Sequence, residues 1–247
     1  MVFGIGLHVI VALFFAIHAV RTGQQIYWLL ILFSFPLLGS VVYFFAIYLP
    51  QSRLQHGARK TMAAVGRALD PTRELREARD AFNFTPTAQN QMRLAAALLA
   101  AGNAAEAAAN YEACLKGPFA SDLEIRLGAS RAFFESGQFD RAISHLRQAR
   151  ADDANFRAEQ VSLLLARALA AAGQQPQAGA EFEAAANRFG SFEANAEYAM
   201  WALASGDHAL AERLLAGLDD TMARWSGHTR ELQMPLVKRL QAVRSGR

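Results

Sequence analysis

Residues 137–149 read GQFDRAISHLRQA, with a glycine first, alanines at offsets of five and twelve residues, and a leucine at an offset of nine. Gly102, Gly173 and Gly206, spaced so that neighbouring glycines lie 33 to 36 residues apart, are also followed by an alanine at offset five and a large apolar residue at offset nine. Positions three and four residues apart share one face of a helix. Each glycine therefore precedes a helix with one packed face.

A second helix precedes each glycine. Apolar or small residues lie in pairs eight and seven positions before the four glycines: Leu94 with Ala95, Ala129 with Ser130, Leu165 with Ala166, and Tyr198 with Ala199. Small side chains at these positions let two helices approach closely. A period near 34 residues with two helices in each unit is typical of stacked helical repeats.

This pattern resembles the tetratricopeptide repeat over residues 88–218, although the usual tryptophan near the start of each unit and the proline at most unit ends are absent. The resemblance implies an all-α solenoid with four helix pairs in residues 87–218. It also implies a concave groove along the first helices that binds an extended or helical peptide. We predict that this groove is lined by Gln91, Arg126, Ser130, Ser162 and Asn195.

The first fifth of the chain has the character of a membrane segment. Residues 1–50 carry one formal charge, Arg21, and uncharged stretches lie on both sides of it, at 2–20 and 26–49. About 20 apolar residues span a bilayer as a helix. The short connection requires a helical hairpin, because backbone amides in lipid need internal partners. The first stretch lacks the basic start and the cleavage site of a signal peptide.

Several residues shape the predicted hairpin. We expect a kink at Pro36 and close helix packing at Gly39, which also leaves self-association open. His8 and His18 lie near span ends, where a neutral imidazole can bond across the hairpin, and we favour that role over transport or metal binding. Interfacial aromatic side chains are expected at Tyr27, Trp28, Tyr43 and Tyr48.

The hairpin resembles the two-helix module that precedes the catalytic domain of phospholipase D type cardiolipin synthases. The residues that carry the resemblance are Trp28, Pro36, Gly39 and Tyr43. The paired His-x-Lys-x4-Asp motifs of those enzymes are absent, since His56 is followed by glycine and alanine. The resemblance therefore implies a shared membrane anchor and not phospholipid synthesis.

Residues 51–86 form a basic juxtamembrane linker with seven basic and four acidic residues. By the positive-inside rule they keep the following region cytoplasmic, in an inner (plasma) membrane that the chain crosses twice. Asp70 and Pro71 predict the start of a short helix over residues 71–82. Four basic residues after the second span could also contact anionic lipid headgroups: Arg53, Arg59, Lys60 and Arg67.

The chain ends in residues 219–247, which alternate apolar and charged residues around Pro235. A solenoid needs a polar outer face on its last unit. We therefore predict a capping helix, or a helix pair interrupted at Pro235. The basic residues of this segment suit either a solvated capping face or contact with the membrane or acidic partners.

No catalytic, cofactor or metal motif is present. The net charge of +3 excludes a nucleic-acid binder driven by bulk charge. The single cysteine, Cys114, falls on a packed repeat position and allows no internal disulfide. Trp201 and Trp225 have apolar neighbours and fit packing better than cofactor stacking.

The sequence thus predicts a non-enzymatic scaffold or adaptor, anchored in the membrane, whose cytoplasmic repeat groove recruits a protein partner. The alternative is an accessory or regulatory subunit of a membrane phospholipid-synthesis enzyme that acts through the hairpin. An enzyme with an unfamiliar site would need titratable groups that converge in a pocket, and the alanine-rich repeats offer few.

Overall fold

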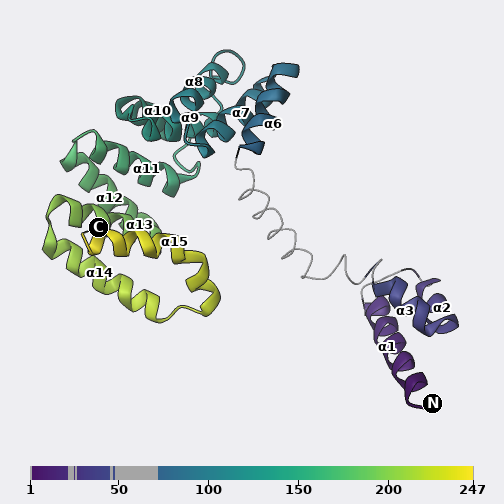
Figure 1. Cartoon of the computed structure of the whole chain (residues 1–247). Helices are drawn as coiled ribbons and strands as arrows, with labels where there is room; N and C mark the ends of the chain where they lie inside the picture. The colour runs from purple at the N-terminus through teal and green to yellow at the C-terminus, as the bar shows by residue number, and fades with distance from the viewer. Residues whose placement is uncertain (1, 22–24, 26, 45–46, 48–71, 247) are drawn as a thin grey trace. The chain divides into compact units, whose positions relative to one another are not determined.

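The computed structural model describes residues 2–21, 25, 27–44, 47 and 72–246. The chain divides into two compact units, Met1–Pro71 and Thr72–Arg247, and each is described here by itself. In the described residues the regular elements are helices (Figure 1). The all-α class predicted for the solenoid is therefore confirmed over the described residues.

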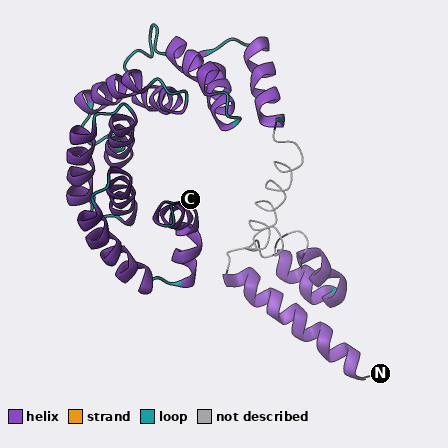
Figure 2. Cartoon of the chain, turned by 60° about the vertical axis from the view of Figure 1, so that its left-hand side comes forward, coloured by secondary structure: helices purple, strands orange, loops and turns teal. Residues whose placement is uncertain are grey.

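Residues 88–223, all of which the structure describes, form four antiparallel helix pairs. The helices are α7 (Ala88–Ala100), α8 (Ala104–Cys114), α9 (Leu123–Glu135), α10 (Phe139–Asp152), α11 (Ala158–Ala171), α12 (Gln175–Phe189), α13 (Phe192–Ser205) and α14 (His208–Ala223). Each helix packs against the next along the chain. The result is an arc of stacked pairs, a helical solenoid (Figure 2).

The four predicted turn glycines connect the two helices of each pair. Gly102, Gly137, Gly173 and Gly206 all have φ between 76° and 83°, a left-handed conformation that glycine adopts without steric cost. The residue after each glycine donates its amide to a carbonyl five residues earlier, as Gln138 does to Phe133 at 2.8 Å. This bond satisfies a carbonyl that the helix end would otherwise leave unpaired.

The packed positions predicted from the repeat are confirmed as core. The alanines at offset five are fully buried in every unit, and the large residues at offset nine are at most 9% exposed. The pairs before each glycine are also buried, including Ser130 and Ala166 at 0%. Alanine in these places lets two helix backbones approach closely. The small residues that recur with the repeat period are therefore the same residues that form the core.

One further helix, α6 (Arg73–Phe84), packs against α7 at the start of the solenoid. Its Ala78 is buried, and Leu75 and Phe82 contact the core of the first repeats. The predicted helix over residues 71–82 thus lies two residues later. It belongs to the compact second unit and not to a linker. Asp70 and Pro71, the predicted start of this helix, lie outside the described residues.

The last helix, α15 (Gly227–Arg244), turns inside the arc of the other helices (Figure 2). Of the two predicted alternatives the structure has the single C-terminal helix and not a pair interrupted at Pro235, because the break falls at residues 224–226 and Pro235 lies within α15. The Ser226 hydroxyl accepts a hydrogen bond from the Thr229 amide at 3.2 Å and so fixes the start of α15. The helix packs against α13, and its Leu240 shares an apolar cluster with residues of α13 and α14.

The first unit contains α1 (Val2–Arg21), α2 (Tyr27–Ser34) and α3 (Pro36–Tyr43), which pack against one another. The kink predicted at Pro36 is present as a break in the second apolar stretch, between α2 and α3. The stretch is split at Phe35, whose φ of −136° and ψ of 73° are not helical, because Pro36 has no amide hydrogen to donate. A Cβ atom on Gly39 would lie 2.7 Å from the Ile31 carbonyl oxygen, so glycine is needed where α3 meets α2.

Tyr43 lies in the centre of this unit. It is fully buried, its ring packs against Phe15 and Trp28, and its hydroxyl oxygen is 3.1 Å from Nδ1 of His18. The prediction of an interfacial Tyr43 is therefore wrong, whereas a bond from His18 across the helices is present. The side chain of His8 lies outside the described residues, as does Tyr48.

The outer surface of the first unit is apolar. Ten large side chains are each more than half exposed: Leu13, Phe14, Ile17, Val20, Tyr27, Leu30, Phe33, Phe35, Leu38 and Val41. Within the part of the chain that the structure describes, no helix combines the length and the apolar character needed to cross a membrane.

Candidate protein-binding surface

An open pocket of about 490 Å³, called the inner pocket below, lies between the first helices of the repeats and α15. It is lined by residues of the first helices α9, α11 and α13, by Phe182 of α12, and by three residues of α15. The pocket thus connects three successive repeats with the C-terminal helix.

Helical spacing places the lining residues. In α11, Arg167, Ala170 and Ala171 are three and four residues apart, and in α13, Glu197, Met200 and Ala204 have the same spacing. Each helix therefore presents one face to the pocket. The opposite faces of these helices carry the buried alanines that contact the second helices.

The pocket has an apolar floor with charged groups at its edge. Met200 and Trp201 are at most half-exposed, and the Arg167 guanidinium lies 4.7 Å from the centroid of the Phe134 ring. No ion pair involving Arg167 occurs among the described residues. An arginine whose guanidinium lies over an aromatic ring keeps donors that can pair with a carboxylate of a partner.

Across the pocket, Glu197 pairs with Arg239 of α15 at 3.0 Å. The Glu197 side chain is only 7% exposed, whereas that of Arg239 is 52% exposed. One turn earlier on α13, burial and the nearby carboxylates of Glu159 and Glu197 raise the pKa of Glu193. This end of the inner surface is therefore acidic, and the cations that act on it are Arg239 of α15 and Arg167 of α11.

Two of the predicted groove residues are buried and cannot contact a partner. Ser130 is fully buried and donates to the Arg126 carbonyl at 2.8 Å, and Ser162 is 7% exposed and lies 3.3 Å from Nη2 of Arg150. Both side chains serve contacts inside the solenoid. Their prediction as groove residues is wrong.

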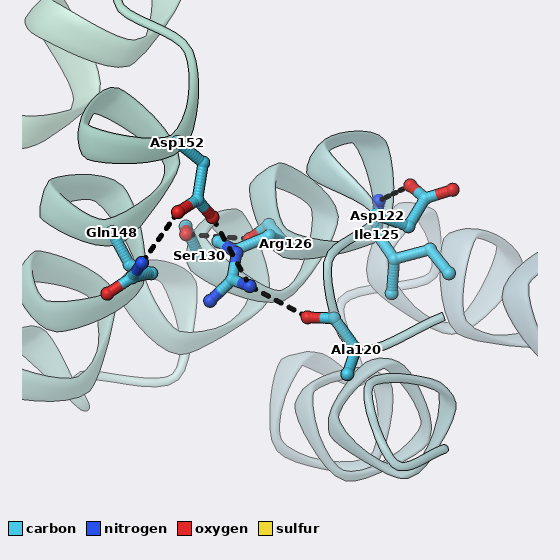
Figure 3. A network of polar contacts seen from close by, with 7 residues as sticks. All are labelled: Ala120, Asp122, Ile125, Arg126, Ser130, Gln148 and Asp152. Atoms are coloured by element: carbon cyan, nitrogen blue, oxygen red, sulfur yellow. Dashed lines mark hydrogen bonds and ion pairs between the residues drawn. The ribbon is translucent and has the colours of Figure 1, made fainter. Parts of the chain in front are cut away.

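Arg126 also has a structural role (Figure 3). Its guanidinium donates to the Ala120 carbonyl at 2.7 Å and lies 3.6 Å from Asp152, with the side chain only 13% exposed. The residue therefore ties the loop before α9 to the end of α10, and it does not line the pocket on the inner surface.

The remaining two predicted residues lie elsewhere. Gln91 is half-buried on α7, and Asn195 is half-buried in a separate pocket of about 220 Å³ between α13 and α14. The structure therefore brings none of the five predicted residues into the inner pocket. Arg53, Arg59, Lys60 and Arg67, the predicted lipid contacts, lie outside the described residues.

The sequence contained a signal for the face that lines the inner pocket. Pocket residues lie six, three and two positions before a turn glycine, as Arg167, Ala170 and Ala171 do before Gly173. The predicted residues lie eleven or seven positions before it. Position seven is the small residue of the packed pair, so Ser130 had to be buried.

Two observations bear on metal binding and on catalysis by the cysteine. Among the described residues, no group of three His, Cys, Asp or Glu side chains could hold a metal ion. Cys114 is 3% exposed, its thiol donates to the Ala88 carbonyl at 3.8 Å, and burial raises its pKa. A thiol held in its neutral form is a poor nucleophile.

The second unit is a solenoid of the tetratricopeptide type. Residues 98–163 match the family model described as tetratricopeptide repeat. The match does not reach the first unit, for which the likeness to the N-terminal module of cardiolipin synthases stays a prediction. No curated protein sequence matches the chain.

Solved structures share this fold. A structure of MamA from Desulfovibrio magneticus RS-1 is 14% identical, with a TM-score of 0.56, and the match covers 68% of this chain and 95% of that one. A thermophilic TPR protein from Thermus thermophilus is 17% identical, with a TM-score of 0.55, over 74% of this chain and 93% of that one. At these identities the likeness extends to the fold alone. Repeats of this type are generally protein-interaction scaffolds, which fits the inner pocket described above.

Proposed function

We propose that this chain is a membrane-anchored scaffold whose inner repeat surface recruits a protein partner to the membrane. The observation that carries the proposal is the open pocket on the first helices, with its apolar floor and its ring-stacked Arg167. A pocket for an apolar anchor beside an available charge is typical of a protein-binding hot spot. Tethering raises the effective concentration of such a partner at the surface.

The exposed apolar side chains of the first unit support the membrane anchor. Ten large apolar residues on α1, α2 and α3 or next to them would be costly in water. Residues 1–50 contain one formal charge, and a basic segment follows them, which favours a cytoplasmic solenoid at an inner membrane. Insertion of the hairpin into lipid would cover these side chains.

A crosslinking experiment in cells tests the recruiting surface. The full chain and two variants that fill the pocket, Ala171→Arg and Ala204→Arg, are crosslinked and captured from membranes. Both alanines are exposed and line the pocket, so arginine there adds bulk without disturbing the core. We expect each variant to lose at least nine-tenths of the captured partner.

Ala180→Arg is the matched control, because Ala180 is exposed on α12 outside the pocket. It should capture the partner as well as the wild-type chain does. Equal capture by all four chains would reject the inner pocket as the recruiting site. The hairpin, and with it a role beside a phospholipid-synthesis enzyme, would then become the better proposal.

A further inference from the structure

The C-terminal helix α15 rests on the solenoid through one narrow stripe. Val237 and Leu240 are its buried residues, and Thr229, Gln233 and Leu236 are half-buried beside them. These positions follow one another at intervals of one, three or four residues, as on one face of an amphipathic helix. The remainder of α15 is exposed.

The stripe covers a face that the repeats present inward. Leu240 clusters with Ala196 and Met200 of α13, and Met200 also lines the inner pocket. Ala242 and Val243, just beyond the stripe, form a wall of the same pocket. The helix therefore occupies part of the surface that a partner would use.

Ion pairs connect α15 with α13 and α14. Arg239, next to Leu240, pairs with Glu197, whose side chain is buried beneath the helix. Glu159 and Glu193 add negative charge nearby. A cationic residue beside an apolar stripe is thus complementary to this face of α13, and Arg244 adds a second contact, to Asp219 of α14 at 3.3 Å.

The helix buries fewer side chains than the neighbouring helices α13 and α14. Leu232, Met234 and Val243 are between 37% and 66% exposed, so α15 leaves large apolar side chains in water. The repeat helices α7 to α14 have between three and eight buried residues each, against two for α15. A helix with so few buried side chains can exchange with a competitor of the same pattern.

We propose that the inner face of α13 is a receptor for an amphipathic helix with an apolar stripe and an adjacent arginine or lysine, and that α15 is the resident helix that such a partner displaces. This proposal rests on the proposed function and names the class of partner. Access to the inner surface is then set by competition between a tethered helix and an incoming one.

A labelled synthetic peptide of residues 227–244 is the probe, and its fluorescence anisotropy is measured with full-length chains. Leu240→Asp in the chain removes the centre of the stripe and should release α15. We expect the peptide to bind this variant at least tenfold more tightly than it binds the wild-type chain. Leu232→Asp, an exposed position on the same helix, should bind the peptide as the wild-type chain does.

A charge exchange tests the position of the peptide. In the Leu240→Asp chain, a peptide carrying Arg239→Glu should bind at least tenfold more weakly than the unchanged peptide. Adding Glu197→Arg to that chain should restore its binding to within threefold. A peptide carrying Lys238→Glu is the control, because Lys238 is exposed and has no ion pair in the described residues.

Hydrogen exchange of the backbone amides distinguishes release of α15 from unfolding of the whole solenoid. In the Arg239→Glu chain, α15 amides should exchange at least tenfold faster while those of α7 to α12 are unchanged. Three results would overturn the proposal. The amides of α15 and α13 could exchange at equal rates in the wild-type chain, or the peptide could bind the wild-type and Leu240→Asp chains equally. The third is that Glu197→Arg fails to restore binding of the Arg239→Glu peptide. If the peptide fails while partner capture still depends on Ala171 and Ala204, the scaffold function stands and this inference falls. If the peptide binds as expected but no partner is captured from cells, the helix-binding face of α13 stands and the scaffold function falls.

Discussion

At the scale of single residues, two glycines inside helices admit large aromatic rings. A Cβ atom on Gly128 would lie 2.6 Å from Cε1 of Tyr111, and one on Gly179 would lie 2.6 Å from Cη2 of Trp201. Glycine in a helix costs about 1 kcal/mol relative to alanine. The packing of each ring against the neighbouring helix that carries the glycine offsets that cost.

Gly128→Ala should therefore destabilise the solenoid, although alanine is the better helix former. The new methyl group must displace the Tyr111 ring, and we expect a loss of about 1–3 kcal/mol. Gly217→Ala is the opposite case, because Gly217 is helical and exposed with nothing within 4 Å of a Cβ atom. It should gain up to about 1 kcal/mol. Urea denaturation of the full chain compares the two, and a gain for both would disprove the contact.

At the scale of elements, the turn glycines set the angle between the two helices of each pair. Gly137 has a φ of 76°, and the amide that follows it bonds to the Phe133 carbonyl. An alanine in this conformation costs roughly 1–2 kcal/mol. Gly137→Ala should lower the free energy of unfolding by that amount, whereas Gly227→Ala, which needs no positive φ, should change it by less than about 0.5 kcal/mol. Equal effects in a chemical melt would argue against a conformational origin.

Elements fixed by local pattern could be predicted from the sequence, and those fixed by distant contacts could not. The helices from α7 to α14 follow from glycines, alanines and large residues at constant offsets, because each pair repeats the same neighbours. The path of α15 depends on Glu197 and Met200, which lie 42 and 40 residues before their contacts Arg239 and Leu240, and no periodicity encodes those contacts. The prediction of Ser130 as a groove residue was wrong for a related reason. Its polarity suggested an exposed position, whereas its offset from Gly137 is that of a buried residue in the packed pair.

In the first unit, too, local features could be predicted from the sequence and contacts between helices could not. Pro36 and Gly39 predicted a kink and a close contact, and both features are present. A complete break at Phe35 and a buried Tyr43 depend on how α2 and α3 fold onto α1, which hydropathy alone does not encode.

At the scale of the whole molecule, the proposed anchor makes a separate prediction. Leu30 and Phe33 are 69% and 65% exposed, so replacing both by aspartate should leave the packing of the first unit intact. Charges on an apolar face disfavour insertion by about 2.5–3.5 kcal/mol each. We expect the Leu30→Asp, Phe33→Asp chain to leave the membrane fraction after carbonate extraction. Leu232→Asp, at a similarly exposed position in the solenoid, should stay in it, and retention of both would reject the anchor.

The inward turn of α15 also bears on how such a chain can grow. Repeat arrays lengthen when a segment encoding one helix pair is duplicated, and a new pair after α14 would carry α15 away from α13. Arg239 would then no longer reach Glu197, and the acidic inner face would be left open. A single duplication at the end of the array would therefore change the ligand preference of a repeat whose own sequence had not changed.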